Sequence, residues 1–111
     1  MTMTERQVGT VTVLALSGKL TLDDGGQLKG KVSNLVAEGH KQIVLNLADV
    51  TLIDSSGLGE IVSCHTTASR ETGAVKLANL GKRSQDLLVI TKLNMVFDVY
   101  TSESEAVASF A

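Results

Sequence analysis

The sequence contains no proline and no tryptophan, and aromatic residues make up only 3% of its 111 residues. With so few rings, the chain lacks the aromatic platforms on which nucleic-acid bases stack. Without proline, its turns must be made by glycine, of which there are ten, and by aspartate and asparagine. The single cysteine excludes an internal disulfide framework and indicates a reducing compartment.

An excess of charge of one sign is also missing. Ten basic and twelve acidic residues give a net charge of −2, so no basic surplus neutralises phosphates and nucleic acid is not an expected partner. The first eight residues lack the charged and apolar regions of a signal peptide, and no apolar run is as long as a transmembrane helix. We therefore expect one cytoplasmic domain over residues 1–111, without membrane insertion.

Hydrophobic periodicity predicts an alternation of strands and helices. Gly9-Thr10 joins two short strands at the spacing of a hairpin, and the second strand is expected inside a sheet because both its faces are partly apolar. A loop is expected at residues 18–26, and Ser102 with Glu105 has the spacing of a capping box. The predicted strands are 5–8, 11–16, 43–47, 75–80 and 96–99, and the predicted helical faces are 27–39, 58–73, 82–91 and 102–110.

This order of elements predicts an α/β fold. Strands that alternate with helices favour a sheet of mostly parallel strands, with helices packed on it. Only the N-terminal hairpin must be antiparallel, and the expected architecture is a mixed sheet with about four helices.

Motifs that could carry chemistry are incomplete. Residues 25–32 match the phosphate-loop spacing GxxxxGK, but Val32 stands where Mg²⁺ binding requires Ser or Thr, and the run lies within a helical pattern. Cys64 and His65 are neighbours on a helix, so their side chains point about 100° apart and do not face one ligand. We therefore predict no catalytic residue, no metal site and no cofactor, and we do not expect an enzyme.

The segment Asp54-Ser55-Ser56-Gly57-Leu58-Gly59 lies between a buried strand and an amphipathic helix. Asp and Ser are preferred helix caps, but a cap needs one such residue and the segment has three. At a helix N-terminus, the macrodipole and the free N–H groups stabilise negative charge, such as a phosphoryl group on a serine. Gly57 and Gly59 are expected to leave the serine hydroxyl open to another protein.

These residues resemble the signature of STAS domains, most closely that of the bacterial anti-sigma factor antagonists. The resemblance extends from about Val11 to Phe110. Its motifs include Ser17-Gly18-Lys19-Leu20, Ile43-Val44-Leu45-Asn46-Leu47, Asp49-Val50, Val75-Lys76-Leu77, Asp86-Leu87-Leu88 and Phe97.

The resemblance implies a STAS fold and a phosphorylation switch. In this family the unphosphorylated antagonist binds an anti-sigma factor, which is also an ATP-dependent serine kinase, and so frees the sigma factor. The kinase phosphorylates the serine before Gly-Leu-Gly, which is Ser56 in this chain, and a metal-dependent Ser/Thr phosphatase reverses the reaction.

The resemblance also implies where the partner is contacted. Contacts are expected around Ser56 and at the loop after the second strand, where the family commonly carries an acidic residue and this chain has Thr21. The expected contact residues are Asp54, Ser55, Ser56, Gly57, Leu58, Thr21, Asp23 and Asp24.

Two alternatives stay open at this point. A STAS domain can also be a scaffold or a regulatory subunit of a signalling or membrane transport complex, in which Ser56 would serve as a helix cap rather than as a phosphate acceptor. A nucleotide-binding domain is disfavoured by the incomplete phosphate loop, and titration with ATP or GTP would identify one.

Overall fold

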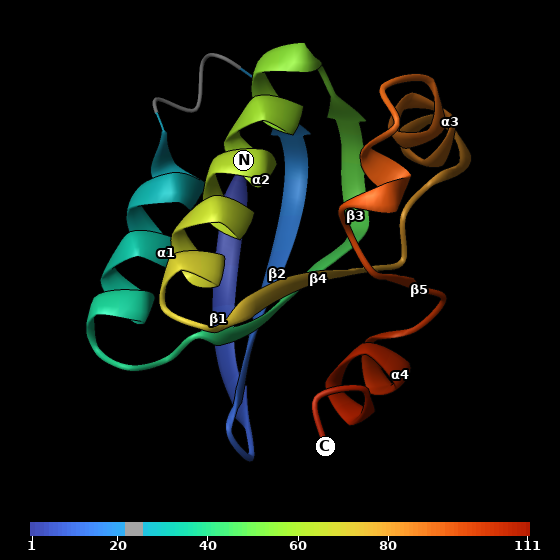
Figure 1. Cartoon of the computed structure of the whole chain (residues 1–111). Coiled ribbons are helices and arrows are strands. Elements are labelled where there is room, and N and C mark those ends of the chain that lie inside the picture. The colour runs from blue at the N-terminus through green and yellow to red at the C-terminus, as the bar shows by residue number, and fades with distance from the viewer. Residues whose placement is uncertain (22–25) are drawn as a thin grey trace.

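The computed structural model describes residues 1–21 and 26–111, and it has the alternation of strands and helices that the sequence predicts (Figure 1). The elements are β1 (Thr2–Val8), β2 (Val11–Leu20), α1 (Gln27–Ala37), β3 (Gln42–Ile53), α2 (Ser55–Arg70), β4 (Ala74–Ala78), α3 (Lys82–Ile90), the short 3-10 helix η2 (Leu93–Met95), β5 (Val99–Tyr100) and α4 (Glu103–Ala108). No helix in these two ranges is long and apolar enough to cross a membrane.

The strands of this part of the chain form one sheet in the order β1-β2-β3-β4-β5. β1 pairs with β2 in antiparallel orientation, and all other neighbours are parallel. Val8 lies opposite Val11 across the hairpin turn, where Gly9 has a φ of 61°, a conformation that glycine adopts without steric cost. The predicted hairpin, the interior position of the second strand and the mostly parallel sheet are confirmed.

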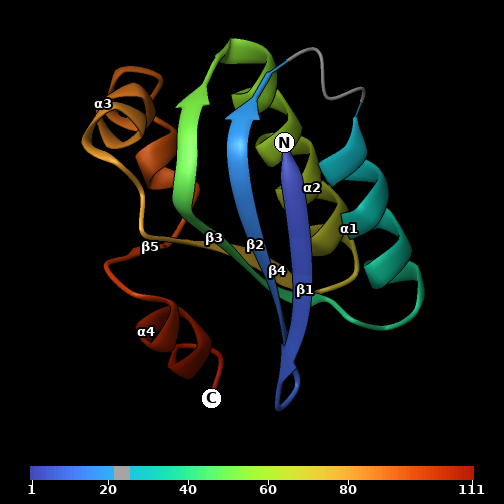
Figure 2. The same cartoon turned by 180° about the vertical axis from the view of Figure 1, so that it is seen from behind.

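Helices cover both faces of the sheet. α1 and α2 lie in front of the sheet in Figure 1 and behind it in Figure 2. Their apolar residues form one large hydrophobic core with the sheet, which we call the large core, and α3 contributes Leu88 to it. On the opposite face, Ala106 of α4 joins Val13 of β2 and Val44 of β3 in a second, smaller cluster. Successive residues along β2, and likewise along β3, therefore point into different cores. This explains why both strands are apolar on both faces.

The two central strands are longer than the sequence predicts. β2 continues to Leu20 and β3 to Ile53, so the first part of the predicted loop at residues 18–26 is strand. The regular alternation of side chains between the two faces of β2 stops at Ser17-Gly18. There the pairing with β3 is irregular, and Gly18 has a φ of 90°. Pairing resumes beyond this irregularity, with Leu20 opposite Ile53. The two strands therefore end together, next to the start of α2.

The predicted last strand at residues 96–99 is wrong in position. Phe97 is buried in the large core, and its backbone N–H donates to the carbonyl of Leu93 at 3.1 Å, so it belongs to the turn that follows η2. β5 is limited to Val99–Tyr100. Phe97, one of the apolar residues that predict a strand here, serves instead to anchor a helical turn.

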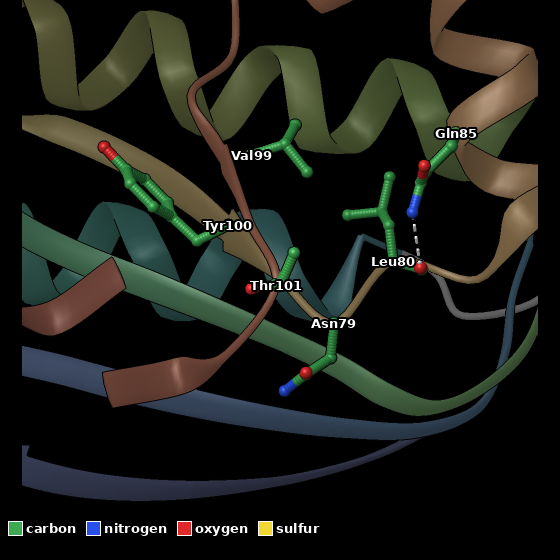
Figure 3. A pocket seen from close by; sticks show the side chains of 6 residues that line it. All are labelled: Asn79, Leu80, Gln85, Val99, Tyr100 and Thr101. Atoms are coloured by element: carbon green, nitrogen blue, oxygen red, sulfur yellow. Dashed lines mark hydrogen bonds between the residues drawn. The ribbon is translucent and has the colours of Figure 1, made fainter. Parts of the chain in front are cut away.

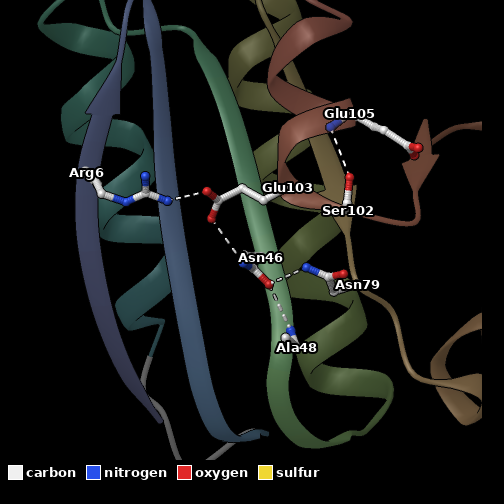
Figure 4. Close-up of polar contacts among 7 residues, drawn as sticks. All are labelled: Arg6, Asn46, Ala48, Asn79, Ser102, Glu103 and Glu105. Atoms are coloured by element: carbon white, nitrogen blue, oxygen red, sulfur yellow. Dashed lines mark hydrogen bonds and ion pairs between the residues drawn. The ribbon is translucent and has the colours of Figure 1, made fainter.

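A polar network ties α4 to the sheet (Figure 4). Glu103 forms an ion pair with Arg6 of β1 and accepts a hydrogen bond from Asn46 Nδ2 of β3 at 3.0 Å. Asn46 Oδ1 in turn accepts from Asn79 Nδ2 and from the backbone N–H of Ala48, both at 3.1 Å. The hydrogen bond from Arg6 holds the pKa of Glu103 below its ordinary value of 4.5. The network gives a reason for an asparagine in the middle of an apolar strand.

The start of α4 confirms half of the predicted capping box. Ser102 Oγ accepts a hydrogen bond from the backbone N–H of Glu105 at 3.2 Å, as Figure 4 shows. The Glu105 carboxylate does not complete the reciprocal bond and accepts from Thr101 Oγ1 at 2.8 Å instead.

Candidate functional site

Asp54 caps α2, at the point where β3 passes into the helix. Its backbone is extended, and its Oδ1 accepts a hydrogen bond from the backbone N–H of Gly57 at 2.8 Å. Its carbonyl accepts from the N–H of Leu58 at 2.9 Å, the first hydrogen bond within the helix. Because the aspartate provides the cap, the hydroxyls of Ser55 and Ser56 are not needed for capping, and both serines are exposed in the first turn.

Ser56 lies in a hollow of about 220 Å³, which we call the Ser56 hollow. α1 follows β2 and α2 follows β3, and these two strands are parallel. Both helices therefore begin at the carboxyl ends of the strands, at the same end of the sheet, as Figure 1 shows. Their N-terminal turns carry the positive ends of the helix dipoles, which favour negative charge. The other lining residues are Thr21, Gly26, Lys29, Gly59, Glu60 and Ser63.

Gly57 serves close packing rather than access to the serine. A Cβ at this position would lie 2.0 Å from the carbonyl oxygen of Leu20, because α2 begins directly on the end of β2. The expectation that Gly57 keeps the hydroxyl open is therefore wrong. At Gly59 a Cβ would meet no atom of another described element within 4 Å, so that glycine leaves open space toward residues 1–21 and 26–111. Leu58 is buried in the large core and anchors the first turn of α2.

The loop after β2 is described only in part. Thr21 lines the Ser56 hollow, so the structure brings it next to the predicted phosphorylation site. The predicted contact residues Asp23 and Asp24 lie outside the described residues.

The motifs judged incomplete have structural roles. α1 begins at Gln27, so Gly30-Lys31 of the GxxxxGK run lies inside the helix instead of preceding it. Cys64 is buried, and burial raises its thiol pKa to about 12, far from the range of a reactive thiolate. The His65 ring packs edge-on against Phe97, with 5.1 Å between ring centroids. In the described ranges, no group of three or more His, Cys, Asp or Glu residues could hold a metal ion.

A second hollow, which the sequence did not indicate, lies at the carboxyl ends of β4 and β5 (Figure 3). It has a volume of about 490 Å³ and is lined by Asn79, Leu80, Gln85, Val99, Tyr100 and Thr101. Gln85 Nε2 donates to the carbonyl of Leu80 at 3.0 Å, so this amide is used to hold the start of α3. The lining carries no charged side chain and offers no nucleophile beyond hydroxyl groups, so its composition does not indicate catalysis.

The division of work between Asp54 and Ser56 predicts how substitutions affect stability. Asp54→Ala removes the cap of α2 and should lower the free energy of unfolding by about 1 kcal/mol. Ser56→Ala should change it by no more than about 0.5 kcal/mol, because the hydroxyl is exposed. Thermal unfolding of both variants tests this. A fall in Tm of more than about 10 °C for Ser56→Ala would show that Ser56 is chiefly structural.

Comparison with known proteins places the chain in a family. A model of the STAS domain matches residues 2–106. The anti-sigma-B factor antagonist of Bacillus subtilis is 30% identical over 84 residues, which are 76% of each chain. The crystal structure of a candidate anti-sigma factor antagonist from Thermotoga maritima has a TM-score of 0.90 at 27% identity, covering 96% of this chain and 92% of that one.

The same fold has also been solved in a phosphorylated state. SpoIIAA, a cell fate determinant of Bacillus, has a TM-score of 0.79 in its phosphorylated form, at 20% identity over 99% of this chain and all of that one. At this identity the likeness concerns the fold.

Proposed function

The chain belongs to the STAS domain family, and we propose that it is an anti-sigma factor antagonist controlled by phosphorylation of Ser56. Its unphosphorylated form binds an anti-sigma factor and thereby releases a sigma factor. The observation that carries the proposal is the exposed Ser56 in the first turn of α2. Because Asp54 caps the helix, the Ser56 hydroxyl is not needed as a cap. The name of the Bacillus subtilis relative supports the same function.

The proposed partners follow from this function. The anti-sigma factor is also the ATP-dependent serine kinase that phosphorylates Ser56, and a Ser/Thr phosphatase removes the phosphoryl group. The chain itself acts as a single binding domain over residues 1–111 and meets these partners in the cytoplasm. It supplies the acceptor hydroxyl and a docking surface, not catalytic groups.

The surroundings of Ser56 suit a reversible phosphoryl group. A phosphoserine carries about −1.5 to −2 charges at neutral pH. The free N–H groups of the first turn and the positive end of the helix dipole stabilise that charge, so the domain itself should stay folded. The proposed contact surface consists of the exposed Ser55 and Ser56 with the neighbouring Thr21, and of Asp23 and Asp24, which follow Thr21 in the sequence. Gly57 and Leu58 support this surface from below.

The modified residue can be identified directly. After incubation with ATP and a lysate of the native cell, the chain should gain one phosphoryl group, and fragment mass spectra should assign it to Ser56. Ser56→Ala should abolish the modification, and Ser55→Ala, one residue away in the same exposed turn, should retain it. Label on Ser55 or elsewhere, with none on Ser56, would contradict the assignment.

A further inference from the structure

Glu60, one turn after Ser56, caps a different helix from its own. Its Oε2 accepts a hydrogen bond from the backbone N–H of Lys29 at 2.8 Å. Lys29 is the third residue of α1. The N-cap of this helix is Gly26, which has no side chain that could accept a hydrogen bond. The first N–H groups of a helix have no partner within the helix and need an outside acceptor. The Glu60 carboxylate of α2 provides an acceptor that the glycine at the N-cap cannot.

The same carboxylate faces the predicted phosphorylation site. Ser56 and Glu60 are four residues apart on α2, the spacing at which side chains are neighbours on a helix. Both line the Ser56 hollow, together with Lys29 of α1. Within the described lining, Lys29 and Glu60 are the charged residues, and they come from different helices, α1 and α2.

A phosphoryl group on Ser56 changes the balance of charge in this hollow. It adds up to two negative charges one helical turn from the Glu60 carboxylate, and like charges at this spacing repel. It also brings three strong acceptor oxygens into the hollow, where the Lys29 side chain is the cation that could pair with them in place of Glu60. The phosphoryl group and the carboxylate therefore compete for the same place.

We propose that Glu60 couples phosphorylation of Ser56 to the N-terminus of α1: the phosphoryl group displaces the Glu60 carboxylate from the Lys29 N–H. This inference rests on the proposed function, because it requires Ser56 to be modified. The consequence is that the modification alters two helix starts, its own on α2 and that of α1. The partner then meets a changed edge of the hollow as well as a new charge.

The proposal can be tested without kinase or partner, in protein that carries phosphoserine at position 56 from translation. Glu60→Ala in the unphosphorylated protein gives the position of the Lys29 backbone amide signal when the carboxylate is absent. In the wild-type background, phosphoserine at position 56 should move the Lys29 amide signal in the 1H-15N spectrum. In the Glu60→Ala background, phosphoserine should move this signal much less. A Lys29 signal that phosphorylation leaves unmoved, or moves equally in both backgrounds, would overturn the proposal.

A thermal cycle gives a second readout. Phosphoserine at position 56 should lower the Tm by about 2 °C more in the wild-type background than in Glu60→Gln, which removes the repelling charge but keeps a hydrogen-bond acceptor. Glu38→Gln, at the exposed C-terminal end of α1, removes the same charge away from the hollow and should show no such difference. Equal losses in the wild-type and Glu60→Gln backgrounds would contradict the coupling. Since no partner is present, either result leaves the proposed binding of an anti-sigma factor to be judged separately.

Discussion

Phosphorylation of Ser56 is expected to weaken binding of the anti-sigma factor by at least about 100-fold. An interface over the exposed first turn of α2 would have to bury a solvated dianion where it had buried a neutral hydroxyl. Leaving a charge unpaired in an interface costs several kcal/mol, and each 1.4 kcal/mol is a factor of ten in affinity. The carboxylates of Asp54 and Glu60, which flank the serine on α2, add charge of the same sign.

Isothermal titration calorimetry on four forms of the chain, the wild type, the phosphoprotein, Ser56→Asp and Asn34→Asp, measures this loss. Ser56→Asp carries one charge and should weaken binding less than phosphoserine does. Asn34→Asp adds the same single charge on an exposed position of α1 and should leave the affinity within a factor of about two to three, since rim charges have small effects. Equal affinities of the wild type and the phosphoprotein would reject the switch and favour the scaffold function.

The same proteins show whether release is local. Backbone NMR shifts should change at the starts of α1 and α2, around the Ser56 hollow. They should stay in place in β1 and β5, at the two edges of the sheet. Changes spread over these edge strands would indicate a global rearrangement instead of local repulsion.

The largest loss of stability is expected from Gly57→Ala. The added Cβ would lie 2.0 Å from the carbonyl oxygen of Leu20, a separation that requires α2 or β2 to move. Overpacking of this kind costs about 1–3 kcal/mol, and more where backbone must shift. For a chain of this size we expect a fall in Tm on the order of 10 °C, measured by circular dichroism or calorimetry.

Gly59→Ala is the matched control for this substitution. Both glycines lie in the first two turns of α2, but a Cβ at Gly59 meets no atom within 4 Å among the described residues outside its own helix. Alanine is favoured over glycine inside helices, so Gly59→Ala should raise stability by up to about 1 kcal/mol. Equal effects of the two substitutions would contradict the packing role of Gly57.

Local patterns in the sequence were sufficient to predict the architecture, because hydrophobic period and turn residues report short-range structure. The hairpin at Gly9, the helix cap at Ser102 and the position of the Asp54–Gly59 segment before a helix are all of this kind. The same patterns failed where long-range pairing decides. β2 and β3 extend past the irregularity at Gly18 because their residues pair with each other there, and this pairing joins segments that are distant in the sequence.

The details of the site depend on contacts between elements that are distant in the sequence. The close approach of Gly57 to Leu20 joins residues 37 positions apart, and no local pattern encodes it. The same is true of the bond between Glu60 and the Lys29 N–H, which spans 31 positions. A glycine that packs and a glycine that opens a surface are identical in sequence, so only the neighbouring backbone distinguishes Gly57 from Gly59.

A pair of pull-downs from the native cell tests most directly whether the state of Ser56 decides binding of an anti-sigma factor. One bait is the unphosphorylated chain, and the other carries phosphoserine at position 56. The unphosphorylated bait should retain an anti-sigma factor with an ATP-dependent kinase domain, identified by mass spectrometry, and the phosphoserine bait should lose it. Recovery of the same proteins in equal amounts on both baits would contradict the proposed switch.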